Sequence, residues 1–128
     1  MNEHIQSPLA HAKGTGSAHA GSAHWLHQRI TAVSNLFLVG WLAWSGATMK
    51  DWSYAGFTAW LAQVPHAVPF ILAVISVCYH AALGTQVVAE DYIHGEGRKM
   101  TTLIFLRLYF TATAVTCIFS ILKIGMKH

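Results

Sequence analysis

Long stretches without charged side chains constrain this chain more than any other feature of its sequence. Residues 30–49 and 52–89 contain no Asp, Glu, Lys or Arg, and Arg107 is the only charged residue within 100–122. A bilayer core accommodates about 20 mostly apolar residues per helix, so the sequence predicts an all-α membrane protein with three transmembrane helices. The predicted spans cover residues 30–48, 66–89 and 100–122.

Composition supports the membrane assignment and argues against other classes of protein. Only 10% of the residues are charged, compared with about 25% in an average soluble domain. The net charge of +3 comes from basic residues that are scattered along the chain, which argues against a nucleic-acid-binding surface. Cys78 and Cys117 both lie inside apolar spans and are expected to be packing residues rather than a disulfide or a metal-binding pair.

The chain divides into an arm and a membrane domain. Residues 1–23 are rich in Gly, Ala, Ser and His and show no apolar period, which predicts a flexible N-terminal arm. No apolar segment follows a basic start, and no arginine precedes Arg29, so neither a secretory signal nor a mitochondrial transit peptide is expected. Residues 24–128 are predicted to form a three-helix transmembrane anchor domain.

Two connections join the predicted spans. The aromatic, amphipathic segment 52–63 is expected to be a turn that lies in the membrane interface. Residues 90–99 predict a polar loop in which Gly95 and Gly97 end the second helix. Basic residues are slightly more numerous on the side of the N-terminus and this loop, so the positive-inside rule favours a cytoplasmic N-terminus.

His80 is the histidine that lies deep inside a predicted span. Ionisable residues at membrane depth are costly and usually functional. Gly84, one helical turn further on, would leave room for a flat macrocycle to approach the helix. The structural alternative is a neutral imidazole that is hydrogen-bonded to a neighbouring helix. Together the two residues favour His80 as an axial ligand of haem iron.

A haem at His80 would require a partner protein. A low-spin electron-transfer haem usually has two axial ligands. His66 and His94 each lie fourteen residues from His80, which is about 21 Å along a helix, so neither can bind the same iron. The second ligand is therefore expected from another chain. Arg29 and His24 are candidates for pairing with the haem propionates, because Arg matches the geometry of a carboxylate.

Asp91 and Tyr92 follow at the end of the same predicted helix. A quinone that is reduced gains two electrons and two protons, so its carbonyl oxygens need a hydrogen-bond donor and a proton route. The Tyr92 hydroxyl can donate, and Asp91 can orient it and relay protons. The alternative is a tyrosine of the aromatic belt beside an acid, although an acid at a helix C-terminus is electrostatically unfavourable. The pair predicts a quinone site.

Three short motifs resemble the small hydrophobic membrane anchor (D) subunit of succinate dehydrogenase, respiratory complex II. They are His-Trp-x-x-Gln-Arg-x-Thr-Ala at 24–32, His-x-x-x-Gly at 80–84 and Asp-Tyr-x-His-Gly at 91–95. The three spans, with the deep histidine in the second, are also similar to that family, and the likeness covers the chain from Gly21 onward. The order and spacing of the motifs make the resemblance more specific than any one of them.

The resemblance implies a particular assembly. The chain would form half of a heterodimeric six-helix anchor bundle with the cytochrome b556 (C) subunit. A haem b between the two subunits would take one histidine from each, here His80. A flavoprotein subunit would oxidise succinate, and an iron–sulfur subunit would pass the electrons to ubiquinone, in the respiratory chain and the tricarboxylic acid cycle. The anchor itself would catalyse nothing alone.

The resemblance also implies roles for single residues. Tyr92 matches the quinone-bonding tyrosine of the family, Asp91 its acidic neighbour, and Arg29 the arginine near the propionates and the quinone. The N-terminal arm is similar to that of bacterial members, which implies a multi-pass protein of a bacterial inner membrane. His27 and Arg107 match no motif of the family. Arg107 is expected to snorkel back to the headgroups rather than to face a partner group inside the bundle.

Two other functions stay open at this point. The related anchor of a quinol–fumarate reductase would take part in the reverse reaction. A small structural membrane protein would have the same spans and no redox centre.

Overall fold

The computed structural model describes residues 18–127, and their side chains from residue 22 onward. This part of the chain is all-helical, and its elements are α2 (Ala18–Ala47), α3 (Tyr54–Leu61), α4 (Val64–Tyr92) and α5 (Glu96–Gly125). The helices α2, α4 and α5 are long and apolar enough to cross a membrane. An α-helix satisfies its backbone hydrogen bonds internally and can therefore span a bilayer. The prediction of three spanning helices is confirmed.

The long helices extend beyond the spans that the sequence predicts. α2 begins at Ala18, so residues 18–23 of the expected arm form its first turns, and residues 1–17 lie outside the described residues. At the other end of the molecule, α4 continues to Tyr92 and α5 already begins at Glu96.

The connection between α4 and α5 is therefore shorter than predicted. It consists of residues 93–95, whereas the sequence predicts a loop over 90–99. The chain leaves helical geometry at Ile93, whose φ is −101° and ψ is 103°. Gly95 is the N-cap of α5 with a φ of −84°, and Gly97 lies inside that helix. The expectation that these two glycines end α4 is wrong, because neither stands at the α4 C-terminus.

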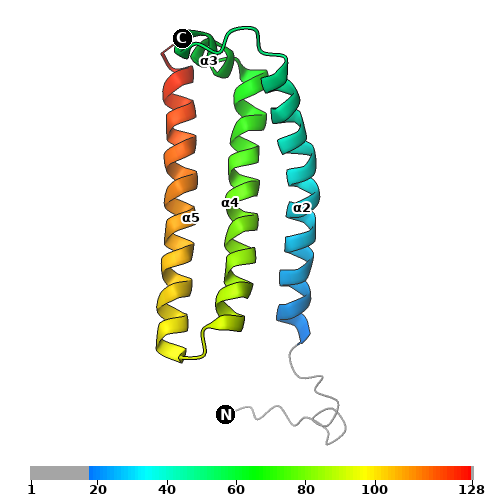
Figure 1. The fold of residues 1–128 in the computed structure, drawn as a ribbon, viewed down its shortest axis with the longest axis vertical. Coiled ribbons are helices and arrows are strands. Elements are labelled where there is room, and N and C mark those ends of the chain that lie inside the picture. Colours follow the sequence, from blue (N-terminus) through cyan, green and yellow to red (C-terminus); the bar gives the residue numbers. More distant parts are fainter. Residues whose placement is uncertain (1–17, 128) are drawn as a thin grey trace, which may run out of the picture.

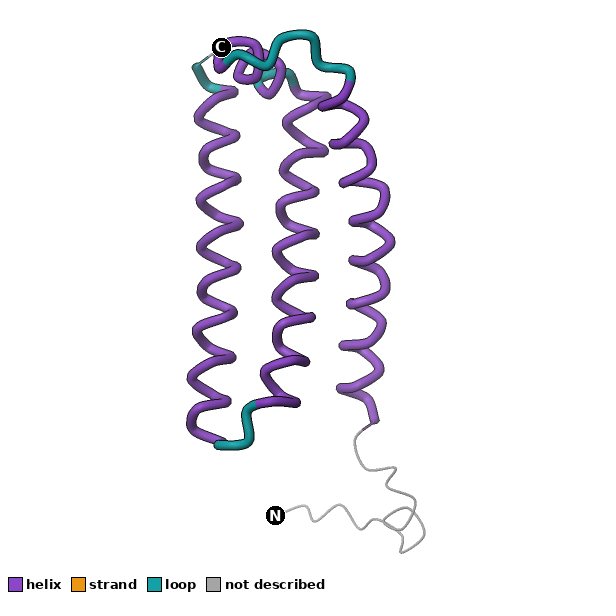
Figure 2. Tube along the Cα trace, viewed as in Figure 1, coloured by secondary structure: helices purple, strands orange, loops and turns teal. Residues whose placement is uncertain are grey.

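The three long helices stand side by side, each antiparallel to its neighbour, with α4 between α2 and α5 (Figure 1). α4 packs against both, whereas α2 and α5 do not contact each other within the described residues. The short helix α3 lies across the end of the molecule where α4 begins and α5 ends (Figure 2), and it contacts both of these helices. The chain thus forms a single layer of spanning helices.

A single layer encloses little core of its own. The buried apolar side chains of the described residues are Leu61, Ala73, Leu83, Ala89 and Ile121. On α2, by contrast, Leu36, Phe37 and Trp44 are each more than 70% exposed. Lipid tails are as apolar as leucine, so these exposed side chains form a surface suited to lipid or to another apolar protein.

α2 presents one regular stripe to α4. A series of the less exposed residues of α2 recurs in steps of four and three, the spacing at which helical side chains share one face. In order they are His24, Gln28, Thr31, Asn35, Leu38, Leu42 and Ser45. We call this stripe and the α4 surface that it meets the α2–α4 seam. The half of the seam nearer the α2 N-terminus is polar.

Hydrogen bonds hold the turn between α2 and α3. The Ser53 hydroxyl accepts from the Gly56 N–H at 3.1 Å and donates to the Asp51 carboxylate at 2.9 Å, which caps α3. The second oxygen of that carboxylate accepts from the Ser53 backbone N–H at 2.8 Å. These two bonds, first the backbone one and then the hydroxyl one, hold the pKa of Asp51 below its usual value of 3.8.

An aromatic cluster closes the same end of the molecule. The His66 ring stacks on Trp60 with ring centroids 4.4 Å apart, and its Nδ1 lies 3.0 Å from the Trp60 carbonyl oxygen. Because a carbonyl only accepts, His66 donates Nδ1–H in this bond. Trp41 of α2 lies beside both rings, at 6.3 and 6.2 Å. These contacts make His66 a structural residue that joins α3 to α4.

We expect Gly56→Ala to destabilise the α2–α3 turn. A Cβ at Gly56 would lie 2.5 Å from the carboxyl carbon of Asp51 and 2.6 Å from its backbone oxygen, and overpacking of this kind costs about 1–3 kcal/mol. Thermal unfolding of the detergent-solubilised protein measures the loss. Gly40→Ala is the control, because a Cβ at Gly40 meets nothing within 4 Å. Equal unfolding temperatures for the two variants would contradict this arrangement.

Candidate functional site

His80 of α4 is joined to Thr31 of α2 by a hydrogen bond across the seam. The distance from His80 Nδ1 to Thr31 Oγ1 is 2.9 Å. The Thr31 hydroxyl also lies 2.8 Å from the backbone carbonyl oxygen of His27. A carbonyl only accepts, and a hydroxyl has one proton. Both contacts are therefore hydrogen bonds only if Thr31 donates to the carbonyl while His80 donates Nδ1–H to Thr31.

This arrangement assigns a proton to Nδ1 of the His80 ring. With the proton on Nδ1, a neutral imidazole carries its lone pair on Nε2. Nε2 makes no hydrogen bond within the described residues. The hydrogen-bonded imidazole that the sequence left as an alternative is thus observed, but it occupies only one of the two ring nitrogens. The other is available to a ligand.

Tyr79, the residue before His80, makes a second link across the seam. Its hydroxyl lies 2.9 Å from His27 Nδ1, and the two rings are tilted with centroids 6.2 Å apart. His27 and Thr31 are one turn apart on α2, so adjacent residues of α4 bond to successive turns of α2. The two bonds together specify how α2 is placed along α4.

Four buried polar atoms have no hydrogen-bond partner within the described residues. They are His24 Nε2, Gln28 Oε1, Asn35 Oδ1 and Ser76 Oγ. Three of them belong to the polar half of the α2 stripe, on both sides of Thr31. An unpaired buried polar group costs about 1–3 kcal/mol. The polar half of the seam therefore has unused hydrogen-bonding capacity for a ligand, for water or for another protein.

Gly84 lies one turn beyond His80 and faces the same helix. A Cβ at Gly84 would lie 3.5 Å from Gln28 Nε2, which is ordinary van der Waals contact. The small residue therefore lets the Gln28 amide approach the α4 backbone closely. Gly84 and His80 share the seam, as their spacing predicts.

The two residues predicted to pair with haem propionates lie on different faces of α2. His24 belongs to the α2–α4 seam, seven residues before Thr31. Arg29 lies two residues before Thr31, about 200° around the helix. Its guanidinium carbon lies 4.8 Å from the Trp25 ring centroid, a cation–π contact on the outer face. The structure thus brings His24, but not Arg29, onto the face of His80.

Asp91 and Tyr92 are the last two residues of α4. Both side chains are exposed, Tyr92 by 79%, and no hydrogen bond joins them in the described part of the chain. Asp91 lies eleven residues beyond His80, or about 16 Å along the helix axis. The two predicted sites therefore occupy one helix at different depths, as expected from the sequence.

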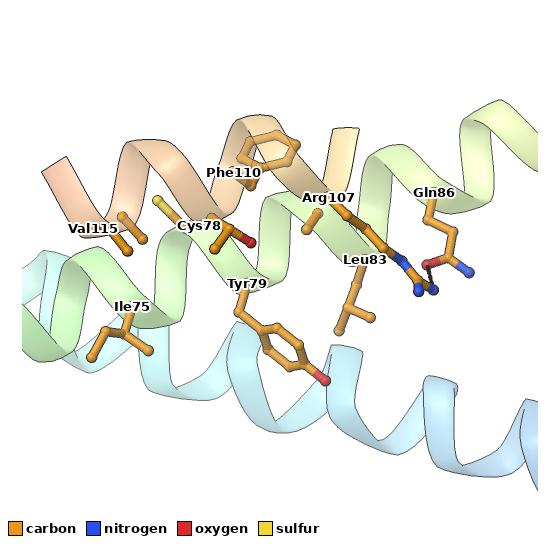
Figure 3. A pocket seen from close by; sticks show the side chains of 11 residues that line it. Ile75, Cys78, Tyr79, Leu83, Gln86, Arg107, Phe110 and Val115 are labelled. Atoms are coloured by element: carbon orange, nitrogen blue, oxygen red, sulfur yellow. Dashed lines mark hydrogen bonds between the residues drawn. The ribbon is translucent and has the colours of Figure 1, made fainter. Parts of the chain in front are cut away.

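A groove of about 440 Å³ lies on the other side of α4, between α4 and α5 (Figure 3). Its lining is mainly apolar, with Gln86 and Arg107 at one end. Arg107 Nη2 donates to Gln86 Oε1 at 3.4 Å, and Gln86 Nε2 donates to Glu90 Oε1 at 2.8 Å. Arg107, expected to snorkel, thus faces a polar partner on α4, and a neutral amide links the cation to a carboxylate. Cys78 lines this groove, and both Cys78 and Cys117 are free thiols, as predicted.

The partners of His80 are what sequence reasoning missed. The motif at 24–32 contains Gln28 and Thr31 but predicts no contact with His80, and Asn35 lies outside it. Their steps of four and three from His24 nevertheless place four polar side chains on one face of a membrane helix. Tyr79 carried no such signal. Within the described residues, no three His, Cys, Asp or Glu side chains gather, so a metal at His80 would bring other ligands with it, as a porphyrin does.

The fold and the site define a class: a three-helix membrane subunit whose central helix carries a histidine with one free ring nitrogen. The profile of the family described as "Succinate dehydrogenase/Fumarate reductase transmembrane subunit" matches residues 3–119. The chain is 36% identical to the succinate dehydrogenase hydrophobic membrane anchor subunit of Rickettsia bellii (strain RML369-C) over 126 residues, which cover 98% of this chain and 100% of that protein.

Two further relatives agree. The succinate dehydrogenase hydrophobic membrane anchor subunits of Rickettsia conorii (strain ATCC VR-613 / Malish 7) and Rickettsia prowazekii (strain Madrid E) are 31% and 29% identical to this chain. Each match covers 94% of this chain and 97% of the relative. The chain belongs to the succinate dehydrogenase/fumarate reductase transmembrane subunit family, as a membrane anchor subunit of the succinate dehydrogenase type. The resemblance inferred from the sequence is confirmed.

We expect the bond between His27 and Tyr79 to couple the two side chains energetically. A double-mutant cycle of His27→Ala and Tyr79→Phe in the solubilised protein should give a coupling of about 0.6 kcal/mol, and at most about 1.7, as found for hydrogen bonds between membrane helices. The control cycle replaces Tyr79→Phe with Tyr109→Phe, whose ring packs against Phe105 and Phe110 of its own helix. Equal coupling in both cycles would contradict the contact.

Proposed function

We propose that this anchor subunit helps to bind haem b and ubiquinone, and that it carries electrons from succinate oxidation to quinone in the respiratory chain and the tricarboxylic acid cycle. The observation that carries the proposal is His80. It stands sixteen residues from the start of α4 and twelve from its end, with Nδ1 bonded to a neighbouring helix. A lone pair on Nε2 at membrane depth suits axial ligation of haem iron.

The residues around His80 fit such a group. His80 would ligate the iron through Nε2, and a flat ring would approach α4 at Gly84 once the Gln28 amide, which lies 3.5 Å from the position of a Cβ there, moves aside. When bound, the haem would supply one-electron redox chemistry. The buried His24 Nε2, which has no partner within the described residues, is suited to donate to a propionate. Arg29 would pair with a propionate as well, but it would have to leave Trp25 and the outer face of α2 to do so.

The single layer of helices supports a protein partner. α4 keeps exposed apolar side chains, among them Leu72 and Val88, and His27, which lies near the level of His80, has its Nδ1 bonded to Tyr79. We infer that the cytochrome b556 (C) subunit completes a heterodimeric six-helix bundle and provides the second axial ligand. The iron–sulfur and flavoprotein subunits would supply the electrons, so the chain is a non-catalytic part of an oxidoreductase.

The end of α4 is the proposed quinone site. Tyr92 is exposed and has no hydrogen-bond partner in the described part of the chain, so its hydroxyl is free to donate to a quinone carbonyl oxygen. Asp91 would accept and relay the protons that the reduced quinone requires. No hydrogen bond joins the two side chains in the described part of the chain, and each would make its own contact with the bound quinone.

We also propose that the protein lies in a bacterial inner membrane as a multi-pass subunit with a cytoplasmic N-terminus. Residues 1–23 would then be a cytoplasmic arm, and residues 24–128 the anchor domain. Tyr92 would lie on the cytoplasmic side, together with the connection 93–95, where the iron–sulfur subunit could reach it.

One alternative has a specific basis. The family description names fumarate reductase as well as succinate dehydrogenase, so an anchor that works with quinol and fumarate is the second candidate. The curated relatives are succinate dehydrogenase subunits, which favours the first. A structural membrane protein without a redox centre would leave the free nitrogen of His80 unexplained.

We expect His80→Ala to remove or greatly weaken the reduced b-type absorption band of the purified complex, because the iron loses one of two axial ligands. His94→Ala is the matched control, since His94 is an exposed histidine in the connection between α4 and α5, and it should leave the band intact. An unchanged band in His80→Ala would refute the haem assignment.

We expect Tyr92→Phe to lower quinone reduction while electron transfer to a soluble dye persists. A positioned proton donor contributes about 10²–10⁴-fold to a rate, so the loss should be at least about tenfold. Tyr54→Phe is the control, because Tyr54 is similarly exposed, by 85%, at the opposite end of the molecule. If quinone reduction survives in Tyr92→Phe, the quinone site lies elsewhere.

A further inference from the structure

We infer that Thr31 is a positioning residue for the proposed haem ligand. Its hydroxyl would select the His80 tautomer whose Nε2 binds iron, hold the ring in place, and lower the reduction potential of that iron. The inference rests on the proposed haem site and goes beyond it, because it assigns the tuning of the cofactor to a side chain of a different helix.

Thr31 differs from the other threonines of the spanning helices. Thr85, Thr113 and Thr116 each donate to a carbonyl oxygen one turn earlier in their own helix, at 2.8–2.9 Å. Within the described residues they form no hydrogen bond to another helix. Thr31 makes the same backbone bond and also meets His80 at 2.9 Å. The hydroxyl thus has a second task that helix geometry alone does not require.

The direction of these bonds decides what Thr31 does to the ring. The Thr31 proton is taken by the His27 carbonyl oxygen, so the hydroxyl oxygen offers His80 only lone pairs. A buried N–H that is left without an acceptor is costly, and the Thr31 oxygen therefore stabilises the tautomer with the proton on Nδ1. Hydrogen bonds in a chain polarise one another, so donation to the carbonyl makes the Thr31 oxygen a better acceptor.

The consequence reaches Nε2. A hydrogen bond from the remote N–H of a metal-bound imidazole fixes its orientation and raises its basicity. A more basic ligand stabilises ferric iron relative to ferrous iron, and haem potentials respond to such hydrogen bonds. Removing the Thr31 hydroxyl should therefore weaken haem binding and raise the midpoint potential. In the described residues, Thr31 is the side chain that bonds His80 Nδ1.

The test uses three variants of the purified complex. Thr31→Val keeps the shape of the side chain and removes the hydroxyl, Thr31→Ser keeps the hydroxyl, and Thr85→Val removes a hydroxyl that bonds only its own helix. Haem content per complex, the midpoint potential from an optical redox titration, and the low-temperature EPR spectrum of ferric haem are measured for each.

Thr31→Val should lower haem affinity by about 10- to 100-fold, as loss of such a partner does in metal sites. It should also raise the midpoint potential; a tenfold change in the preference for ferric over ferrous iron corresponds to about 59 mV. Thr31→Ser should restore both quantities, and Thr85→Val should change neither. Wild-type potential and affinity in Thr31→Val would overturn the inference, as would a Thr31→Ser variant as impaired as Thr31→Val.

The outcomes separate this inference from the proposed function. If the unaltered complex contains no b-type haem, or if His80→Ala leaves its spectrum unchanged, the haem site itself fails. If His80→Ala abolishes the band and Thr31→Val behaves as the unaltered complex does, only the role of Thr31 fails.

A second experiment leaves Thr31 in place and serves if Thr31→Val does not assemble. In His80→Gly, added imidazole can replace the missing ring and donate its N–H to Thr31, whereas 1-methylimidazole cannot. 4-Methylimidazole has the same added methyl group and keeps the N–H, so it controls for size. Imidazole and 4-methylimidazole should bind the haem more tightly than 1-methylimidazole. Equal binding of all three would overturn the inference.

Discussion

The absence of water from the bilayer interior is the constraint on which the rest of this structure depends. Backbone groups must be satisfied within each helix, which explains the long uninterrupted helices α2, α4 and α5. Apolar side chains gain little by leaving lipid for a neighbouring helix, so the few polar side chains carry much of the specificity of packing. The bonds from Thr31 to His80 and from His27 to Tyr79 place α2 on α4 in one register.

The same bonds connect packing with function. They use Nδ1 of His80 and leave Nε2 to a ligand, so the contact that orders the helix pair also prepares the ring. The buried polar atoms on either side of Thr31 that have no partner in the described part of the chain could bond to a ligand or to another protein. On the opposite side of α4, the chain from Arg107 through Gln86 to Glu90 satisfies a membrane cation inside the subunit. The polar groups between α4 and α5 are paired, whereas several between α2 and α4 have no partner in the described residues. Such a helix layer is suited to assembly with a second protein.

Much of the fold could be predicted from the positions of the charged residues alone, because charged side chains are rare within a membrane span. The ends of the helices could not. The sequence predicts a loop over 90–99, but the connection consists of residues 93–95, because Gly95 caps the start of α5 and does not end α4. Of the candidate site, the sequence predicts His80 and the pair Asp91 and Tyr92 from their chemistry and spacing, and their roles stay proposals. Their surroundings could not be predicted, since the partner of His80 lies forty-nine residues away along the chain.

The sequence by itself determined the class of protein, the number of spanning helices and the depth of the histidine, because hydropathy and helical rise are local properties that each segment carries alone. Only the tertiary structure decided which ring nitrogen of His80 is bonded, which face of α2 meets α4, and that Arg107 has a partner. Those facts depend on which helix lies beside which and at what height. The identity of a side chain does not tell which residue of another helix it contacts. That contact is defined only when α2 and α4 are packed together in one register.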